Sequence, residues 1–129
     1  MIQQFIELGQ GYGDVYELCE LIKTNETRFH EAFIFTSYKK EQKVCSLAVA
    51  FKPVGESKFM PIYVCREGIP YNEGKQTKRL GLFEEALSAI GKQANTVEIK
   101  HSSFFTETAQ FYQYLIGILR MSHYIPPMH

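Results

Sequence analysis

Three glycines near the start of the chain, Gly9, Gly11 and Gly13, stand between an apolar segment and a segment with helical spacing. A glycine turn at the start of a helix binds phosphate when its N–H groups point at the ligand. Here the third glycine comes one residue too early for the G-x-G-x-x-G dinucleotide pattern. The carboxylate of Asp14 would also occupy the helix N-terminus where a phosphate would bind. The stretch therefore predicts a turn followed by a helix capped at Asp14.

A second group of polar residues lies in residues 66–79, REGIPYNEGKQTKR. Its last two cations would fall in the first turn of the next helix, where positive charge opposes the helix dipole. One hypothesis is that these cations bind a small anionic ligand. The alternative is that they are solvated or paired with Glu67, Glu84 or Glu85. The candidate ligand-binding residues are Arg66, Glu67, Tyr71, Lys78 and Arg79.

Aspartate is scarce, because Asp14 is the only one in the chain. Phosphoryl transfer of the protein-kinase type needs one aspartate toward the nucleophile and another on magnesium. The four histidines also lack the spacing of a metal-ligand cluster. We therefore predict no catalytic set, no metal site and no cofactor, and the balance favours a protein that is not an enzyme.

The chain has 129 residues and a formal net charge of +0, which creates no basic field for nucleic acid or anionic lipid. Nucleic acid is therefore not the expected partner. Three cysteines form an odd set that indicates a reducing compartment, and we interpret Cys45 and Cys65 as buried small hydrophobes. No apolar run approaches the roughly 18 residues of a membrane span, and the N-terminus lacks a signal-peptide pattern. We expect a cytoplasmic protein without a membrane partner.

Hydrophobic periodicity divides the chain into helices and strands. Apolar residues recur at helical spacing after Asp14, in residues 80–90 and in residues 102–125. Residues 2–8 are short and apolar enough for a strand, with a helix as the alternative. Pro61 cannot donate to a ladder, which predicts an edge strand or a bulge at that position. The predicted strands cover residues 2–8, 28–38, 44–52, 58–65 and 96–101.

These elements predict a single domain over residues 1–129 with an α/β (α+β) fold in the order (β)αβββαβα. Short polar turns make the three middle strands an antiparallel meander, and the helix after them permits a parallel crossover. The continuous apolar runs of the meander need cover on both sides. We expect a mixed sheet with helices on both faces.

The order helix, three meander strands, helix, strand is similar in topology to the PD-(D/E)xK, or restriction-endonuclease-like, fold. The resemblance implies metal bound by an acid on the second core strand and by an acid-x-Lys triplet on the third. The corresponding segments, AFK at residues 50–52 and VCREG at residues 64–68, lack that triplet. Glu17 and Glu20 could mimic the helix carboxylate of that family, but without strand partners they do not make a magnesium site.

Three longer segments resemble a small uncharacterised protein family of Gram-positive bacteria over the whole chain. They are GYGDVYELCELIK, YVCREGIPY and YQYLIGILRMSHYIPP. Some members of that family carry a methylthioribose kinase label. The scarcity of aspartate and the short chain argue against that activity here, and the resemblance implies no known catalytic residues.

The last predicted helix and its approach contain more aromatic residues than one core-facing stripe requires. Those left outside would form an apolar patch, and such patches often mark interfaces. We therefore predict a homodimer through this aromatic-rich face. The aromatic residues are Phe104, Phe105, Phe111, Tyr112, Tyr114 and Tyr124.

Together these patterns favour a cytoplasmic binding or interaction protein. One alternative is a small enzyme or phosphate-ligand-binding protein that uses the loop from Arg66 to Arg79. Another is an inactive nuclease-like domain that binds nucleic acid.

Overall fold

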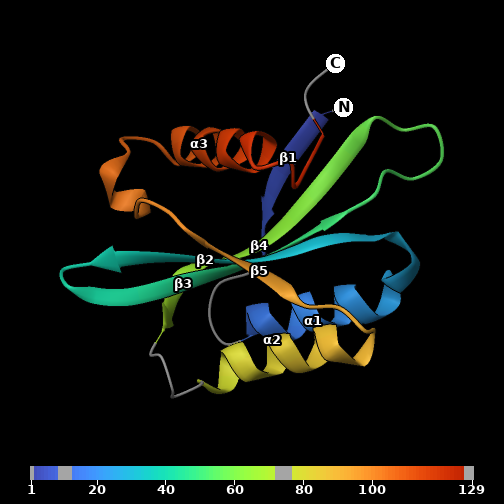
Figure 1. Cartoon of the computed structure of the whole chain (residues 1–129), viewed down its shortest axis with the longest axis horizontal. Helices are drawn as coiled ribbons and strands as arrows, with labels where there is room; N and C mark the ends of the chain where they lie inside the picture. Colours follow the sequence, from blue (N-terminus) through green and yellow to red (C-terminus); the bar gives the residue numbers. More distant parts are fainter. Residues whose placement is uncertain (1, 9–12, 72–76, 127–129) are drawn as a thin grey trace.

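Segments with alternating or continuous apolar residues form one five-stranded sheet in the described part of the chain (Figure 1). The computed structural model describes residues 2–8, 13–71 and 77–126. The strand order across the sheet is β1-β4-β3-β2-β5. Residues 2–8 contain a strand, which decides between the strand and helix alternatives. The strands are β1 (Ile2–Glu7), β2 (Phe29–Lys39), β3 (Gln42–Phe51), β4 (Phe59–Pro70) and β5 (Ala94–Glu98).

β2, β3 and β4 form the predicted antiparallel meander, and the two edge strands join it in parallel. β1 pairs with β4, and β5 pairs with β2. α1 (Gly13–Thr24) connects β1 to β2, and α2 (Lys78–Ala89) lies between β4 and β5 in the chain. Parallel strands require such crossovers because a tight turn reverses the chain direction. The α/β class, the order (β)αβββαβα and the parallel crossover are confirmed.

Helices cover both faces of the sheet, as the apolar meander strands predict. α1 and α2 lie side by side on one face, and α3 (Thr108–Met121) lies on the other (Figure 1). β2 shows why both layers are needed, since its side chains alternate between them. Ala32 and Ile34 belong to the core under α1 and α2, whereas Phe33 and Phe35 belong to the core under α3.

β4 is longer than the sequence predicts, since it runs to Pro70 rather than ending at Cys65. Its pairing with β3 is irregular, because Leu47 pairs with Cys65 while Cys45 pairs with Ile69. β4 therefore uses more residues than β3 over the same span. The ladder resumes at Ile69, whose apolar side chain is fully buried. An irregularity of this kind breaks the alternation on which a strand prediction depends.

Pro61 lies in an interior strand, so the predicted edge or bulge at this position is wrong. It pairs with Gln4 in the regular parallel register of β1 and β4. On the other side of β4, the ladder with β3 ends at the pair of Ala50 and Ile62, so Pro61 lies one residue outside it. The missing N–H of Pro61 therefore lies beyond the end of that ladder, where proline is tolerated.

α3 is shorter than the predicted helix over residues 102–125. Ser102–Phe104 form a separate 3-10 helix, and α3 begins at Thr108. The helix ends at Met121, and His123 follows with a φ of 63°. A left-handed residue of this kind ends a helix. Within the described residues, no helix has both the length and the apolar character needed to cross a membrane.

Candidate functional site

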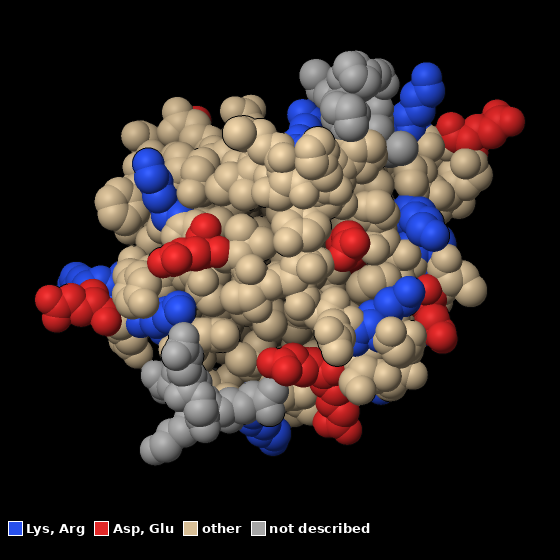
Figure 2. Space-filling model, in the orientation of Figure 1, with Lys and Arg blue, Asp and Glu red and all other residues tan. Residues whose placement is uncertain are grey.

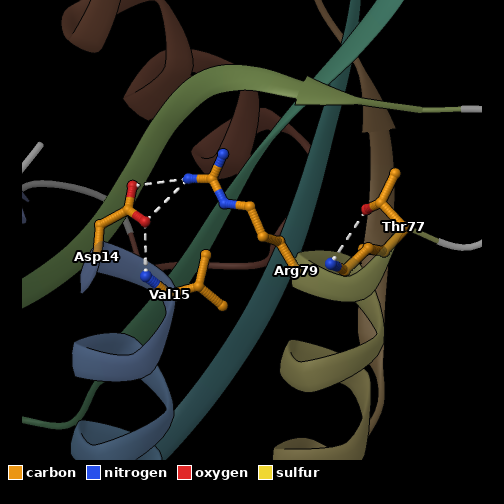
Figure 3. A network of polar contacts seen from close by, with 5 residues as sticks. Asp14, Val15, Thr77 and Arg79 are labelled. Carbon is orange, nitrogen blue, oxygen red and sulfur yellow. Dashed lines mark hydrogen bonds and ion pairs between the residues drawn. The ribbon is translucent and has the colours of Figure 1, made fainter. Parts of the chain in front are cut away.

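The first turns of α1 and α2 meet beyond the carboxyl ends of the neighbouring strands β1 and β4. Asp14 is 6% exposed, and Nη2 of Arg79 donates to its Oδ1 at 2.9 Å and to its Oδ2 at 3.1 Å (Figure 3). The N–H of Val15 donates to the same Oδ1 at 2.7 Å. Thr77 caps α2, because its hydroxyl accepts from the N–H of Leu80 at 3.3 Å. The guanidinium of Arg79 thus joins the starts of both helices.

The ion pair balances charge at these helix ends. The carboxylate of Asp14 is favourable beside the positive end of the α1 dipole, whereas a guanidinium in the first turn of α2 is unfavourable without a nearby acid. Sequence reasoning proposes Glu67, Glu84 or Glu85 as the acid. The structure pairs Arg79 with Asp14, 65 residues earlier in the chain. The side chain of Glu67 lies outside the described part of the structure. The signal for this pairing was the placement of both residues at helix starts that follow adjacent parallel strands.

Two buried thiols lie on the sheet near this ion pair. Burial raises the pKa of Cys45 to about 12, and the positive charge of Arg79 offsets part of that rise. Burial also raises the pKa of Cys65, and the negative charge of Asp14 adds to the effect. Both thiols are free and stay protonated near neutral pH, so neither is an activated nucleophile. The interpretation of Cys45 and Cys65 as buried small hydrophobes is confirmed.

Two histidines make contacts that stabilise the fold. Nε2 of His30 lies 2.8 Å from the carbonyl oxygen of Tyr124. His101 is buried, and its Nδ1 accepts from the N–H of Ser103 at 3.1 Å. Among residues 2–8, 13–71 and 77–126, no three His, Cys, Asp or Glu side chains are grouped so that they could hold a metal ion.

Of the five predicted ligand-binding residues, Tyr71, Lys78 and Arg79 have described side chains. Tyr71 is half-buried and lines a cleft beside α2. Lys78 is exposed at the start of α2, while the side chain of Arg79 turns toward α1. The side chains of Arg66 and Glu67 lie outside the described part of the structure. Tyr71 is the one of the three described residues that lines the cleft between α2 and β5.

This cleft, of about 680 Å³, lies between α2 and the edge strand β5. Ile34 and Leu87 are buried and contribute apolar surface to it, while polar side chains from the end of α2 and from β5 complete the lining. Sequence reasoning missed these polar residues. The alternation of Thr96, Val97 and Glu98 in the sequence could have indicated Thr96, whereas Ser88 and Gln93 have no comparable signal. The charged side chains of Glu84 and Lys92 also line the cleft.

β5 forms one wall of this cleft and one edge of the described sheet. The N–H of Ile99 donates to the carbonyl oxygen of Thr36 in β2 at 2.8 Å. Successive residues of a strand direct their backbone groups to alternate sides, so those of Thr96 and Glu98 point away from β2. No strand in the described residues pairs with that outer side. β5 therefore presents backbone donors and acceptors beside the cleft.

The surface in the view of Figure 1 is mostly uncharged across its middle. Figure 2 shows that Lys, Arg, Asp and Glu side chains lie mainly around the outline of this view. The formal net charge of the chain is +0.

The aromatic residues of α3 pack mainly against the sheet and do not form an outer face. Phe111 is buried, and Tyr112 stacks on Phe5 of β1 with ring centroids 4.8 Å apart. Of the six aromatic residues predicted to form an interface, Phe104 is the one with a largely exposed side chain, at 73%. Phe111 is therefore part of the core, and four of the other aromatic residues pack partly buried against it.

Small residues on β3 allow these rings to pack inward. Ala48 and Ala50 face α3 and are fully buried, and their small side chains leave space for the rings above them. Tyr114 reaches the edge of this layer, where its hydroxyl accepts from the N–H of Lys100 at 3.1 Å. The surplus of aromatic residues therefore compensates for small residues on the sheet.

A family model described as a domain of unknown function, DUF7147, matches residues 1–125 of the chain. No curated protein and no solved structure matches it.

Proposed function

We propose that this chain, which belongs to the DUF7147 family, is a binding protein that takes an extended peptide segment in the cleft between α2 and β5. One observation carries the proposal: β5 is an edge strand and also a wall of the cleft. A peptide in that cleft would add a strand to the sheet, with main-chain hydrogen bonds for affinity and side-chain pockets for specificity.

The backbone of β5 provides the hydrogen bonds for such a peptide. The outward N–H and C=O groups of Thr96 and Glu98 are spaced for a strand partner. The start of β5 is held in place, because Nδ2 of Asn95 donates to Oε2 of Glu31 at 2.7 Å and to the carbonyl oxygen of Ala32 at 3.3 Å. A fixed edge lowers the entropy cost of adding a strand.

The residues that line the cleft determine which peptide side chains it would accept. Ile34 and Leu87 would contact an apolar side chain, whereas Ser88, Gln93 and Thr96 would face polar ones. Side chains on a strand alternate between its two faces, so every second residue of the peptide would enter the cleft. Glu84 and Lys92 also line the cleft, so a charged side chain of the peptide would pair with one of them. We therefore expect a preference for an alternating sequence.

Selection of random short peptides on the immobilised wild-type protein tests this proposal. We expect the selected peptides to lose binding by about tenfold or more in Thr96→Pro, which removes one outward N–H and obstructs strand addition. Thr96→Val is the matched control, because it keeps the N–H and should keep most of the affinity. Hydrogen exchange should show protection of the Thr96 and Glu98 amides by peptide. Equal binding to wild type and Thr96→Pro would contradict the proposal.

An anionic ligand at the loop from Arg66 to Arg79, in a small enzyme or a phosphate-binding protein, is the second candidate. Two positive helix ends meet there, and Lys78 adds an exposed cation in the first turn of α2. The carboxylate of Asp14 opposes an anion at the same place. A phosphate titration of wild type against Arg79→Ala distinguishes the two, since equal affinities would remove this candidate.

An inactive nuclease-like scaffold that binds nucleic acid is a third candidate, supported by the order of helices and strands alone. The net charge of +0 argues against it. A duplex DNA shift assay at two salt concentrations tests it. A shift that weakens with salt would revive it.

A cytoplasmic location belongs to the main proposal. Cys19, Cys45 and Cys65 are free thiols, a state that reducing compartments preserve. Cell fractionation tests this point, and recovery of the protein from the extracellular medium would contradict it.

A further inference from the structure

The edge of the sheet opposite β5 is β1, and we infer that it pairs with β1 of a second copy of the chain. The two strands would run antiparallel about a two-fold axis and would join the two sheets into one. This inference concerns a different edge from the peptide cleft and does not depend on it. The partner is identified by the fit of β1 to itself.

The backbone of β1 leaves one side available for pairing. The N–H of Ile2 donates to the carbonyl oxygen of Lys58 at 2.7 Å, and the N–H of Leu8 donates to that of Val64 at 3.0 Å. Even-numbered residues of β1 therefore bond to β4. The backbone groups of Gln3 and the other odd-numbered residues point to the outer side. No strand of the described residues occupies that side.

The side chains of β1 on the α1–α2 face are not covered by those helices. Ile2 is 58% exposed, Gln4 is exposed and Ile6 is half-buried. Ile2 and Ile6, on either side of Gln4, therefore expose apolar surface to water unless a partner covers it. Gln4, midway between them, is polar without being charged. This pattern is symmetric about Gln4.

That symmetry defines one register for the pair of strands. With the two-fold axis at Gln4, its side chain faces the partner's Gln4, and Ile2 faces the partner's Ile6. The outward-pointing Gln3 would then exchange backbone hydrogen bonds with the partner's Phe5. The two copies of Gln4 then form a pair without mutual backbone hydrogen bonds, the type of pair in which opposed side chains lie closest together. Both isoleucine pairs bury apolar surface on the same face.

Charge does not oppose this contact. A two-fold interface brings each charge near its own copy, so an exposed net charge would be repelled. Glu7 is the charged residue of β1, and its Oε1 accepts from the hydroxyl of Tyr112 at 2.5 Å. Arg120 of α3 donates to Oε1 of Gln3. With the two-fold axis at Gln4, the two copies of Glu7 are six residue positions apart along the paired strands, about 20 Å, so their charges repel each other little.

The flank of α3 above β1 is also uncharged apart from Arg120. The contacts of Tyr112 with Phe5 and of Arg120 with Gln3 identify this flank. At 100° per residue, Ala109, Gln113 and Ile116 lie on the same side of the helix. Their small or neutral side chains create no repulsion between the two copies of α3.

β1 lacks the features that protect a sheet edge from pairing with a second copy. Natural proteins protect exposed edges with lysine, proline or bulges. β1 has none of these, and its register with β4 is regular along its length. β1 is therefore suited to pair with a second copy.

Light scattering on the full chain, coupled to size-exclusion chromatography, tests the inference. We expect wild type to give twice the protomer mass of 14.9 kDa. Gln4→Lys and Gln4→Glu should each halve that mass, because each places two like charges directly opposite across the axis. An equimolar mixture of the two variants should restore the mass of the dimer. Gln4→Thr, a neutral strand-forming residue, is the matched control and should stay dimeric.

Three outcomes would overturn the inference. They are a wild-type protein that is monomeric at every concentration, a Gln4→Lys variant that stays dimeric, and a charge-paired mixture that fails to associate. Circular dichroism checks that the Gln4 variants remain folded. Should they unfold, Ile2→Lys serves in their place. Ile2 is exposed, so the change should leave the fold intact, but it would replace an apolar contact with the partner's Ile6 by a charge. Retention of the dimer in Ile2→Lys would equally refute the contact.

Discussion

Arg79, in the first turn of α2, places its Nη2 2.9 Å from Oδ1 of Asp14, in the first turn of α1. The two residues are 65 positions apart in the chain, and their contact joins the starts of the two helices that cross the same face of the sheet. The Asp14 carboxylate is nearly inaccessible, whereas the guanidinium is partly exposed. The pair therefore acts first as a clamp between α1 and α2.

Removal of either partner should destabilise the fold. Arg79→Ala leaves the buried carboxylate of Asp14 without its charged donor, and we expect a loss of about 1.5–3 kcal/mol in the free energy of unfolding. Urea denaturation measures it. Combining Arg79→Ala with Asp14→Asn in a double-mutant cycle should show a favourable coupling energy. Lys78→Ala, an exposed neighbour, should change stability by less than about 0.5 kcal/mol. Equal effects of the Lys78 and Arg79 variants would contradict the clamp.

Stability should fall at alkaline pH because of the two buried thiols. Burial raises the folded pKa of Cys45 to about 12 and also raises that of Cys65, in both cases above the ordinary thiol value of 9.0. Above pH 9 the unfolded chain therefore releases thiol protons that the folded chain retains. The stabilisation is fully present below pH 9 and is lost as pH rises toward the folded pKa. Each thiol contributes a slope of at most about 1.4 kcal/mol per pH unit.

Urea denaturation at a series of alkaline pH values measures this slope. Cys45→Ala is the comparison, since it should unfold more easily at neutral pH but lose less stability as pH rises. An identical slope in wild type and Cys45→Ala would show that other groups control the alkaline limit.

Gln3 should matter more than its position at the sheet edge suggests. It is 6% exposed, its Nε2 donates to the carbonyl oxygen of Pro126 at 2.8 Å, and its Oε1 accepts from Nε of Arg120 at 3.0 Å. Gln3→Leu leaves a guanidinium and a carbonyl without this partner, and we expect a loss of about 1–3 kcal/mol. Thermal unfolding measures it. Gln4→Thr should have little effect, and the opposite ranking would refute this role.

Two phenylalanines near the C-terminus test whether the aromatic residues serve the core. Phe111→Ala removes a fully buried ring and should cost about 3–5 kcal/mol in the free energy of unfolding. Phe104→Ala removes an exposed ring and should change stability by less than about 0.5 kcal/mol. If Phe104→Ala instead alters oligomeric mass, the aromatic face would regain its place as an interface.

The helices, the meander and the crossovers follow from local patterns in the sequence. The alternation in β2 and β3 and the helical spacing after Asp14 each depend on residues close together in the chain. Burial on one or two faces produces these patterns directly. The class and order of the fold were therefore predictable, although the end of β4 was not, because its irregularity breaks the alternation.

The candidate sites depend on contacts between distant segments, which local patterns do not encode. The cleft combines Tyr71 after β4 with Gln93 before β5, and no spacing rule connects them. The clamp joins Asp14 to Arg79 because two parallel strands place their helices side by side. The α3 aromatic residues were assigned to the surface because their counterparts, Ala48 and Ala50, lie on a strand far away in sequence.

The pairing of β1 with β4 also bears on the order in which the chain assembles. Ile2 must find Phe59, whereas the hairpin of β2 and β3 closes over two residues, Lys40 and Glu41. Short loops close at lower entropy cost and sooner than long ones. The meander should therefore form a nucleus onto which β1 docks late. The same strand should be the first to detach when the native state fluctuates, so transient opening would expose the edge of β4 that β1 covers.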